Sequence, residues 1–509
     1  MRPYRHIHAV ALLGALSGAC ASTAALTDTP AARTARYLAS IQGEAAQEAA
    51  FLREMPKGGD LHNHLSGSVY AESYLRWAVE DGFCVRRSPA AVLEPPCDPA
   101  VGSLPAADAL PRDTALYNAL VDGLSLRNFV AGPRSGHEQF FSTFAGFNTR
   151  RERSGDMLAE VVSRLARQNT WYLESMQSLG VGAAGRLGAA AGWSDDLAAM
   201  RARLPEASLD ALVVAARGRL DAEESRMREV LRCGQSNEDP GCRVVVRYVV
   251  QVIRTLPREE VFAQIAAAVK VVQGDPRVVA LNLVAPEDDP VARRDYDVHM
   301  RAVAHLTERG TRVPVSLHAG ELTPVLVPPE DAGFHIADAV RVAGARRIGH
   351  GTDIAWERDA HALLREMAQR RVAVEVCPAS AEGILGVRGS DHPFALYRAA
   401  GVPMTLCTDD EGVSRSDLTR EYLRARSWWG LDWATLKSLA RNALIHAFVA
   451  GDPLWRDDHG ARVDACATDA GDAPEGRACV ELLARSDRAR AQWTFDVAMR
   501  RFEARWPPR

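Results

Sequence analysis

The chain has 509 residues, a net charge of −4, and ordinary globular shares of hydrophobic (47%) and charged (25%) residues. This length suits one elaborated domain with a large buried core. The charge is slightly negative and no basic run is interleaved with aromatic residues. We therefore expect no nucleic-acid partner.

Residues 1–21 have the features of an export signal. Two arginines precede the apolar run AVALLGALSGA, and small residues surround Cys20. This order is typical of a secretory signal, and the run is too short for a transmembrane span. The stretch LSGAC resembles a lipobox with Ser17 in place of the preferred leucine, so Cys20 is a candidate lipid anchor; cleavage after Ala21 or Ala25 is the alternative. We expect an exported protein, periplasmic or extracellular, rather than a disordered N-terminus without a targeting role.

Six of the other eight cysteines form close pairs in the sequence, and each pair brackets a polar segment. The pairs are Cys84 with Cys97, Cys233 with Cys242, and Cys466 with Cys479. Three disulfides would suit an oxidising compartment. Free thiols are the alternative, and zinc binding is disfavoured because no CxxC occurs. Cys377 and Cys407 lie in apolar runs and are expected to be buried strand thiols.

Residues 22–54 are rich in alanine and are expected to be helical or loosely ordered. From about Met55, short apolar runs alternate with longer helical segments. Eight runs are candidate strands: 58–64, 170–177, 243–253, 278–285, 313–321, 346–351, 372–380 and 402–410. Continuous apolar strands separated by helices predict a parallel α/β fold, and eight units favour a (β/α)8 TIM-type barrel.

One barrel domain is expected to extend over residues 55–509, with helical and disulfide-bearing insertions. Residues 81–135 contain many prolines and little periodicity, and residues 180–242 contain a Gly/Ala-rich stretch followed by a predicted helix pair. Neither insertion has the pattern of an independent domain. A third cysteine-bracketed segment, 466–479, interrupts the C-terminal helical region.

Polar residues stand at the ends of four predicted strands. They are His62 and His64 in HNH, His318 and Glu321 in HAGE, His350 in GHG, and Asp409 and Asp410 in TDD. Barrel enzymes place their active sites at the carboxyl ends of the strands, so these groups should converge although they span nearly 350 residues. Each motif alone has a structural alternative: a buried histidine, a turn or helix cap, or a glycine-flanked loop.

The converging set predicts a metal site. Alternation along a strand places His62 and His64 on one face, and His318 and Asp409 add a third nitrogen and an oxygen. Three imidazoles and one carboxylate suit one Zn²⁺ per chain, with one open position for a water that loses its proton near neutral pH.

The other members of the set suit acid–base work. Glu321 can donate a proton to a substrate ring that the metal-bound water attacks, and His350 can accept or orient the proton of that water. Asp410 can accept a hydrogen bond from a protonated nitrogen of the substrate.

The segments MPKGGDLHNHLSGS, SLHAGE, RIGHGTD, VCPAS and LCTDDEG resemble successive signatures of the adenosine deaminase family, within the amidohydrolase superfamily. The resemblance covers about residues 55–450 apart from the two insertions. The MPKG lead-in and the cysteine-bearing segments are more similar to the secreted, growth-factor-like branch. The resemblance implies a zinc-dependent aminohydrolase. It implies zinc ligation by His62, His64, His318 and Asp409, ring protonation by Glu321, water orientation by His350 and purine contact by Asp410.

Three positions depart from the family pattern. Ser66 stands where classical members carry an aspartate that binds the ribose, and Ala285 stands where a glycine amide meets the purine. Ala381 and Glu382 follow Ser380 where serine and asparagine are usual. The aromatic run FFSTF, residues 140–144, resembles the apolar lid helix of the family, and a core helix face is the alternative.

The expected function is hydrolytic deamination of adenosine or a related purine nucleoside, with an inosine-type product and ammonia. One alternative is another amidohydrolase that acts on a different aminopurine or amine, since fold alone does not fix the substrate. The other is an exported binding or signalling protein with incidental deaminase activity, which would have no need of Glu321 and His350 together.

Overall fold

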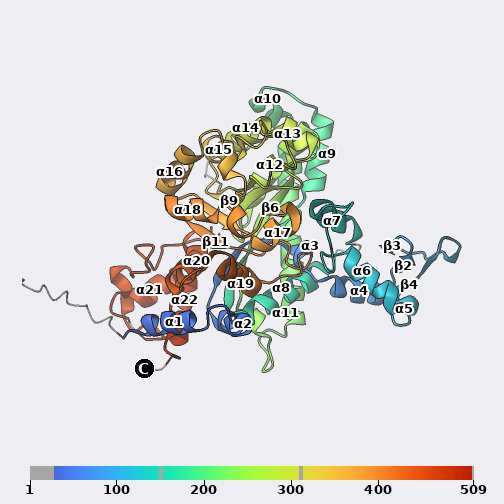
Figure 1. Ribbon diagram of the computed structural model, residues 1–509. Coiled ribbons are helices and arrows are strands. Elements are labelled where there is room, and N and C mark those ends of the chain that lie inside the picture. Colours follow the sequence, from blue (N-terminus) through green and yellow to red (C-terminus); the bar gives the residue numbers. More distant parts are fainter. Residues whose placement is uncertain (1–27, 148–152, 309–312, 470, 507–509) are drawn as a thin grey trace, which may run out of the picture.

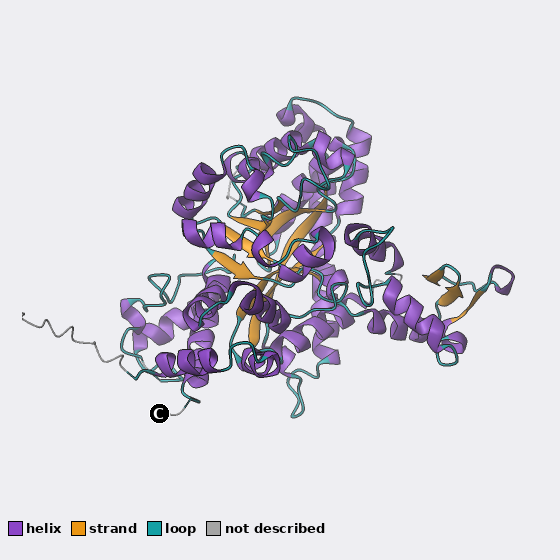
Figure 2. Ribbon diagram, viewed as in Figure 1, coloured by secondary structure: helices purple, strands orange, loops and turns teal. Residues whose placement is uncertain are grey.

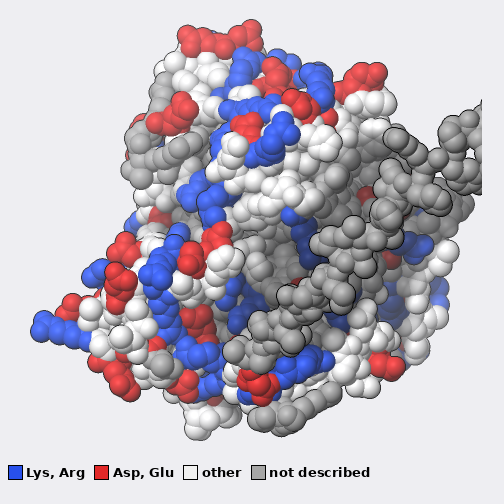
Figure 3. Space-filling model, turned by 60° about the vertical axis from the view of Figure 1, so that its left-hand side comes forward, with Lys and Arg blue, Asp and Glu red and all other residues white. Residues whose placement is uncertain are grey.

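The computed structural model describes residues 28–147, 153–308, 313–469 and 471–506. The predicted export signal, with Cys20, lies outside these residues. Within the described part, none of the helices combines the length and apolar character that a bilayer crossing requires. On the face shown in Figure 3, basic and acidic side chains are interspersed, as on an ordinary solvated surface.

The core of the structure is a ring of eight parallel strands (Figures 1 and 2). They are β1 (Gly58–His64), β5 (Thr170–Gln177), β6 (Val245–Ile253), β7 (Val278–Val284), β8 (Ser316–Ala319), β9 (Arg347–His350), β10 (Ala373–Val376) and β11 (Met404–Leu406). Hydrogen bonding orders them as β1-β5-β6-β7 and β8-β9-β10-β11. Parallel bridges between Asn63 and Asp409 and between Leu281 and Val315 join the two sheets at both seams. The predicted α/β barrel is therefore confirmed.

Helices cover the outside of the ring because the strands are apolar on both faces. Every residue of β1, β7 and β10 is buried. The helices between and after the strands are α8 (Ser154–Ala166), α12 (Arg258–Gly274), α13 (Pro290–Arg294), α14 (Tyr296–Thr307), α15 (His335–Arg341), α16 (Ala360–Arg370), α17 (Pro378–Leu385), α18 (Phe394–Ala400), α19 (Leu418–Trp429) and α20 (Trp433–Ile445). The alanine-rich middle of α12 packs closely on β6 and β7 because its side chains are short.

The insertion at 81–135 carries a small antiparallel sheet, which projects away from the barrel beside α4 (Ala71–Glu80). Its strands are β2 (Cys84–Arg87), β3 (Ala90–Leu93) and β4 (Ser103–Pro105), in the order β3-β2-β4. Helices α5 (Ala106–Ala109), α6 (Thr114–Gly123) and α7 (Gly136–Thr143) follow, and α3 (Leu65–Ser68) directly follows β1. The sequence predicted no strands here, because runs of three or four residues are too short to show a period.

The second insertion is helical, as expected. It contains α9 (Val181–Ala191), α10 (Leu197–Arg203) and α11 (Glu206–Val230). The Gly/Ala-rich stretch forms α9 and packs on α12. A Cβ atom at Gly188 would lie 2.1 Å from the carbonyl oxygen of Glu259, so glycine permits this close helix contact.

The two ends of the described chain pack together beside the barrel (Figure 1). Residues 28–54 form α1 (Pro30–Ser40) and α2 (Ala45–Glu54), and the C-terminal region forms α21 (Arg477–Arg485) and α22 (Asp487–Glu503). The ring of Tyr37 stacks on that of Trp506 at 3.9 Å, and Phe51 meets Phe502 edge-on at 5.1 Å. These aromatic contacts attach the N-terminal helices to the C-terminal ones.

The three cysteine pairs form the expected disulfides, with Cα–Cα distances of 5.5, 5.5 and 4.8 Å. Cys377 and Cys407 are free and buried, as their apolar runs predicted.

Peptide mapping of unreduced protein should therefore recover three links: Cys84–Cys97, Cys233–Cys242 and Cys466–Cys479. Cys377 and Cys407 should react with an alkylating reagent only after unfolding, because burial raises the pKa of both thiols and blocks access. Rapid alkylation of either thiol in the folded protein, or a crossed pairing, would contradict this arrangement.

Candidate metal centre and active site

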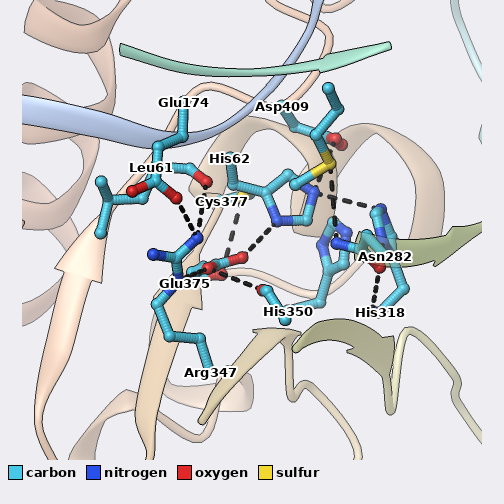
Figure 4. Close-up of polar contacts among 12 residues, drawn as sticks. Leu61, His62, Glu174, Asn282, His318, Arg347, His350, Glu375, Cys377 and Asp409 are labelled. Atoms are coloured by element: carbon cyan, nitrogen blue, oxygen red, sulfur yellow. Dashed lines mark hydrogen bonds and ion pairs between the residues drawn. The ribbon is translucent and has the colours of Figure 1, made fainter. Parts of the chain in front are cut away.

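Four side chains from the carboxyl ends of β1, β8 and β11 converge inside the ring. Figure 4 shows His62, His318 and Asp409 of this group. The Nε2 atom of His318 lies 3.1 Å from Nε2 of His62 and 3.2 Å from Nε2 of His64. Oδ1 of Asp409 lies 3.3 and 3.2 Å from the same two nitrogens. The structure thus brings together the four predicted metal ligands, with one ligand atom from each within 4.8 Å of the others.

The other nitrogen of each imidazole lies beside a side-chain oxygen. Nδ1 of His62 lies 2.7 Å from Oε2 of Glu375, and Nδ1 of His64 lies 2.7 Å from Oε1 of Gln251. Nδ1 of His318 lies 2.9 Å from Oδ1 of Asn282. Each Nδ1–H donates to its oxygen, so the Nε2 atom of a neutral ring keeps a lone pair. Three Nε2 atoms and one carboxylate oxygen thus face one another, and this donor set fits a metal ion.

The sequence analysis did not identify the residues that orient the ligands. Glu375, Gln251 and Asn282 each interrupt an apolar strand, in VAVEVC, VVQVI and VALNLV. Ser380 donates its hydroxyl to Oδ2 of Asp409 at 2.7 Å. A single polar residue within a buried strand was the available signal, because such a group needs a partner inside the barrel.

A buried arginine keeps the partner of His62 ionised. Arg347 contacts Oε1 of Glu375, and its Nη2 lies 2.5 Å from Oε2 of Glu174 (Figure 4). Burial alone would raise the pKa of Glu375, but the guanidinium and the hydrogen bond from His62 hold it at about 2. Glu375 therefore stays a carboxylate. By accepting the Nδ1–H of His62, it fixes the tautomer of that imidazole ring.

Glu321 and His350 lie beside the ligand cluster, with Oε1 of Glu321 3.6 Å from Nε2 of His350. Burial, together with the negative charges of Asp409 and Glu287, raises the pKa of Glu321 well above its usual value. Burial lowers the pKa of His350 to about 3. The two shifts favour the protonated form of Glu321 and the neutral form of His350, which are the forms that a proton donor and a proton acceptor need.

Asp410, which follows the ligand Asp409 in the chain, is also buried. Burial, followed by the charge of Asp409, raises its pKa to about 8, and its Oδ1 atom has no hydrogen-bond partner among the described residues. A Cβ atom at Gly67 would lie 1.5 Å from that oxygen, so a larger residue after Ser66 would displace the carboxyl group.

A cavity of about 360 Å³ opens onto these groups. Its polar wall is His64, Ser66, Gln251, His318, Glu321, Asp409 and Asp410, and its apolar wall is Phe140, Phe141, Phe144, Ile253, Val284, Ala285 and Pro286. The three phenylalanines, from α7 and the residue after it, cover the cavity and also pack with Ile384 and Val413. They thus combine the lid position with a small core cluster. The lining set contains neither lysine nor arginine among the residues that the structure describes.

The residues that depart from the family pattern fall in two places. Ser66 is exposed on the cavity wall, and Ala285 lies at the end of β7. Ala381 and Glu382 lie on α17, where Oε2 of Glu382 lies 3.3 Å from Nε of Arg424. Ser66 and Ala285 line the cavity and can contact a ligand directly. Ala381 and Glu382 are not among the residues that line it.

Ala285 adopts a backbone conformation that suits glycine, with a φ of 81°. Replacement Ala285→Gly should therefore raise the free energy of unfolding by about 1 kcal/mol, because a side chain costs about that much in the left-handed region. Ala280→Gly, in the regular part of β7, is the matched control and should destabilise. Chemical denaturation of both variants gives the comparison, and equal destabilisation by the two changes would show that Ala285 is unstrained.

Comparisons with known proteins agree with this geometry. The adenosine deaminase family profile matches residues 208–454. An adenosine deaminase of Enterococcus faecalis is 35% identical over 141 residues, which cover 28% of this chain and 38% of that protein. The chain thus matches well under two thirds of this curated relative's length.

Two solved structures share the fold at low sequence identity. The N6-mAMP deaminase of Arabidopsis superposes with a TM-score of 0.52 at 19% identity, covering 79% of this chain and 96% of that one. An amidohydrolase of Burkholderia ambifaria with bound zinc superposes with a TM-score of 0.52 at 17% identity. The match covers 79% of this chain and 88% of that one. The expected growth-factor-like branch stays a prediction. The profile match and the curated relatives place residues 208–454 of this chain in the adenosine deaminase family.

Proposed function

We propose that the protein hydrolytically deaminates an uncharged purine nucleoside, adenosine or a close relative, with one Zn²⁺ per chain. The observation that carries the proposal is a cavity that is lined by Glu321 and reaches the converging ligand atoms, with His350 3.6 Å from Glu321 behind its wall. A protein that only bound nucleosides would not need a buried acid and base of opposite function.

The reaction replaces the amino group by water and needs two proton movements. Zn²⁺ suits three imidazoles and one carboxylate, and when bound it would act as a Lewis acid that makes water nucleophilic near neutral pH. His350 accepts a proton from the attacking water. Glu321 gives its proton to a ring nitrogen as the ring carbon becomes tetrahedral, and the amino group then leaves as ammonia. Asp410 contacts the opposite side of the purine.

The lining of the cavity favours a nucleoside over a nucleotide. The described lining residues include neither a lysine nor an arginine. A 5′-phosphate normally needs an arginine, a lysine or backbone N–H groups to replace its hydration. The N6-mAMP named for the Arabidopsis relative carries such a phosphate, so we expect a different substrate here.

Ser66 favours a second candidate, a free aminopurine. A serine hydroxyl is shorter than the aspartate of classical members and uncharged, so the sugar is held less strongly. Ammonia release from adenosine, 2′-deoxyadenosine, adenine and AMP separates the candidates. The proposal expects adenosine or deoxyadenosine to give the largest kcat/KM. A preference for adenine would establish the second candidate, and a preference for AMP or no ammonia from any compound would overturn the proposal.

We also propose that the protein is exported. The N-terminal segment has the order of an export signal, and three disulfides suit an oxidising compartment. Cell fractionation with mass analysis of the mature N-terminus tests this: acylated Cys20 means a lipid anchor, and a start after Ala21 or Ala25 means ordinary cleavage. Recovery of the intact N-terminus from the cytosol would contradict export.

Glu321→Gln should lower kcat by roughly 10²–10⁴-fold, because glutamine keeps the shape of the side chain but cannot deliver the proton. Zinc content should remain normal, since Glu321 is not a proposed ligand. His318→Ala is the contrasting variant and should lose metal and activity together. Steady-state kinetics with metal analysis measures both, and near-normal turnover by Glu321→Gln would refute the assigned acid.

A further inference from the structure

The HAGE segment, residues 318–321, leaves strand β8 just before Glu321, the proposed acid. Strand β8 ends at Ala319, and Gly320 turns the chain with a φ of 74°. The N–H groups of Gly320 and Glu321 point away from the neighbouring strand and are buried. Both donate to one carboxylate, that of Glu287: Gly320 to Oε1 at 3.1 Å and Glu321 to Oε2 at 2.9 Å.

Glu287 is itself held by the first residue of α15. It is buried, and its Oε1 atom lies 2.5 Å from Nδ1 of His335. The ring of His335 stacks on Tyr296 at 3.8 Å, and the hydroxyl of Tyr296 donates to the His335 carbonyl oxygen at 2.7 Å. Burial alone would raise the pKa of Glu287, but the hydrogen bond and charge of His335 hold it at about 2. The carboxylate is thus a rigid, permanently charged acceptor.

A buried arginine fixes the carbonyl groups of the same region. Nε of Arg254 donates to the Ala285 carbonyl at 3.1 Å, and its Nη1 donates to the His318 carbonyl at 3.2 Å. Nη1 of Arg254 also lies 3.9 Å from Oε1 of Glu287. Together the two side chains bind both N–H and C=O groups where β7 and β8 end.

We propose that Glu287 is a positioning residue that fixes the orientation of the Glu321 carboxyl group for proton transfer. The inference rests on the proposed deaminase function. The Glu321 side chain has three rotatable bonds, so its placement depends on a fixed backbone beneath it, and a misplacement of about 1 Å can cost roughly 100-fold in rate. The negative charge of Glu287 also favours the protonated form of Glu321.

A carboxylate in the C-terminal region supplies the matched control. Oδ1 of Asp469 accepts the N–H groups of Glu475 at 2.6 Å and Gly476 at 2.9 Å, in the cysteine-bracketed segment 466–479. Asp469 therefore performs the same backbone task as Glu287, but in a segment that carries no proposed catalytic group. Loss of either carboxylate should destabilise the fold, and only loss of Glu287 should disturb Glu321.

The test compares Glu287→Gln with Asp469→Asn, both loaded with zinc. We expect Glu287→Gln to lower kcat roughly 100-fold with little change in KM and normal zinc content. Asp469→Asn should lower the melting temperature and leave kcat near that of the parent. A second variant, Glu287→Asp, keeps the charge beside His335 but is too short to reach both N–H groups, so it should also lower kcat.

Crystal structures of the same variants give a readout that does not depend on turnover. The Glu321 carboxyl group should be displaced in Glu287→Gln and unmoved in Asp469→Asn. An unmoved Glu321 in both Glu287 variants, or equal losses of kcat in the Glu287 and Asp469 variants, would overturn the inference. If the parent deaminates no purine but Glu287→Gln displaces Glu321, the positioning role holds and the proposed function fails.

Discussion

The structure depends on one electrostatic constraint: three imidazole nitrogens and a carboxylate oxygen face one another inside an apolar ring. Such a set is favourable around a cation, which holds the ligands together. Its geometry requires the ends of β1, β8 and β11 to meet, and it requires an acceptor behind each imidazole. Glu375, Gln251 and Asn282 supply these acceptors from three further strands. Six strand ends are thus fixed by the chemistry of one small site, and the hydrophobic effect stabilises the ring that carries them.

The buried charges around the site orient groups more than they stabilise the fold. Burying an ion pair costs desolvation that the attraction between its members often does no more than offset. Arg347 keeps Glu375 ionised behind a ligand, and Arg254 with Glu287 binds the backbone beside the acid. Three residues with side chains, Ala285, His350 and Asp409, also adopt left-handed backbone conformations at strand ends. Strain of this kind collects where function requires a particular side-chain direction.

The sequence predicted the eight barrel strands because each is a short, mainly apolar run between longer helical segments. It also predicted the residues that converge, since strand ends of a parallel barrel meet at one face. It did not reveal Glu375 or Asn282, because the inward direction of a residue in the middle of a strand is visible only once the ring closes. Glu287 was missed because the amides it binds lie 33 and 34 residues away. The small β2–β4 sheet was missed because its strands are too short to show alternation.

The central claim is that the converging ligands form a single metal site on which turnover depends. Stepwise addition of Zn²⁺ to chelator-treated protein, with ammonia release from the best nucleoside measured at each step, tests it most directly. The account predicts no activity without metal and a linear rise that stops at about one equivalent per chain. Full activity in metal-free protein, or a rise that continues to two equivalents, would contradict it.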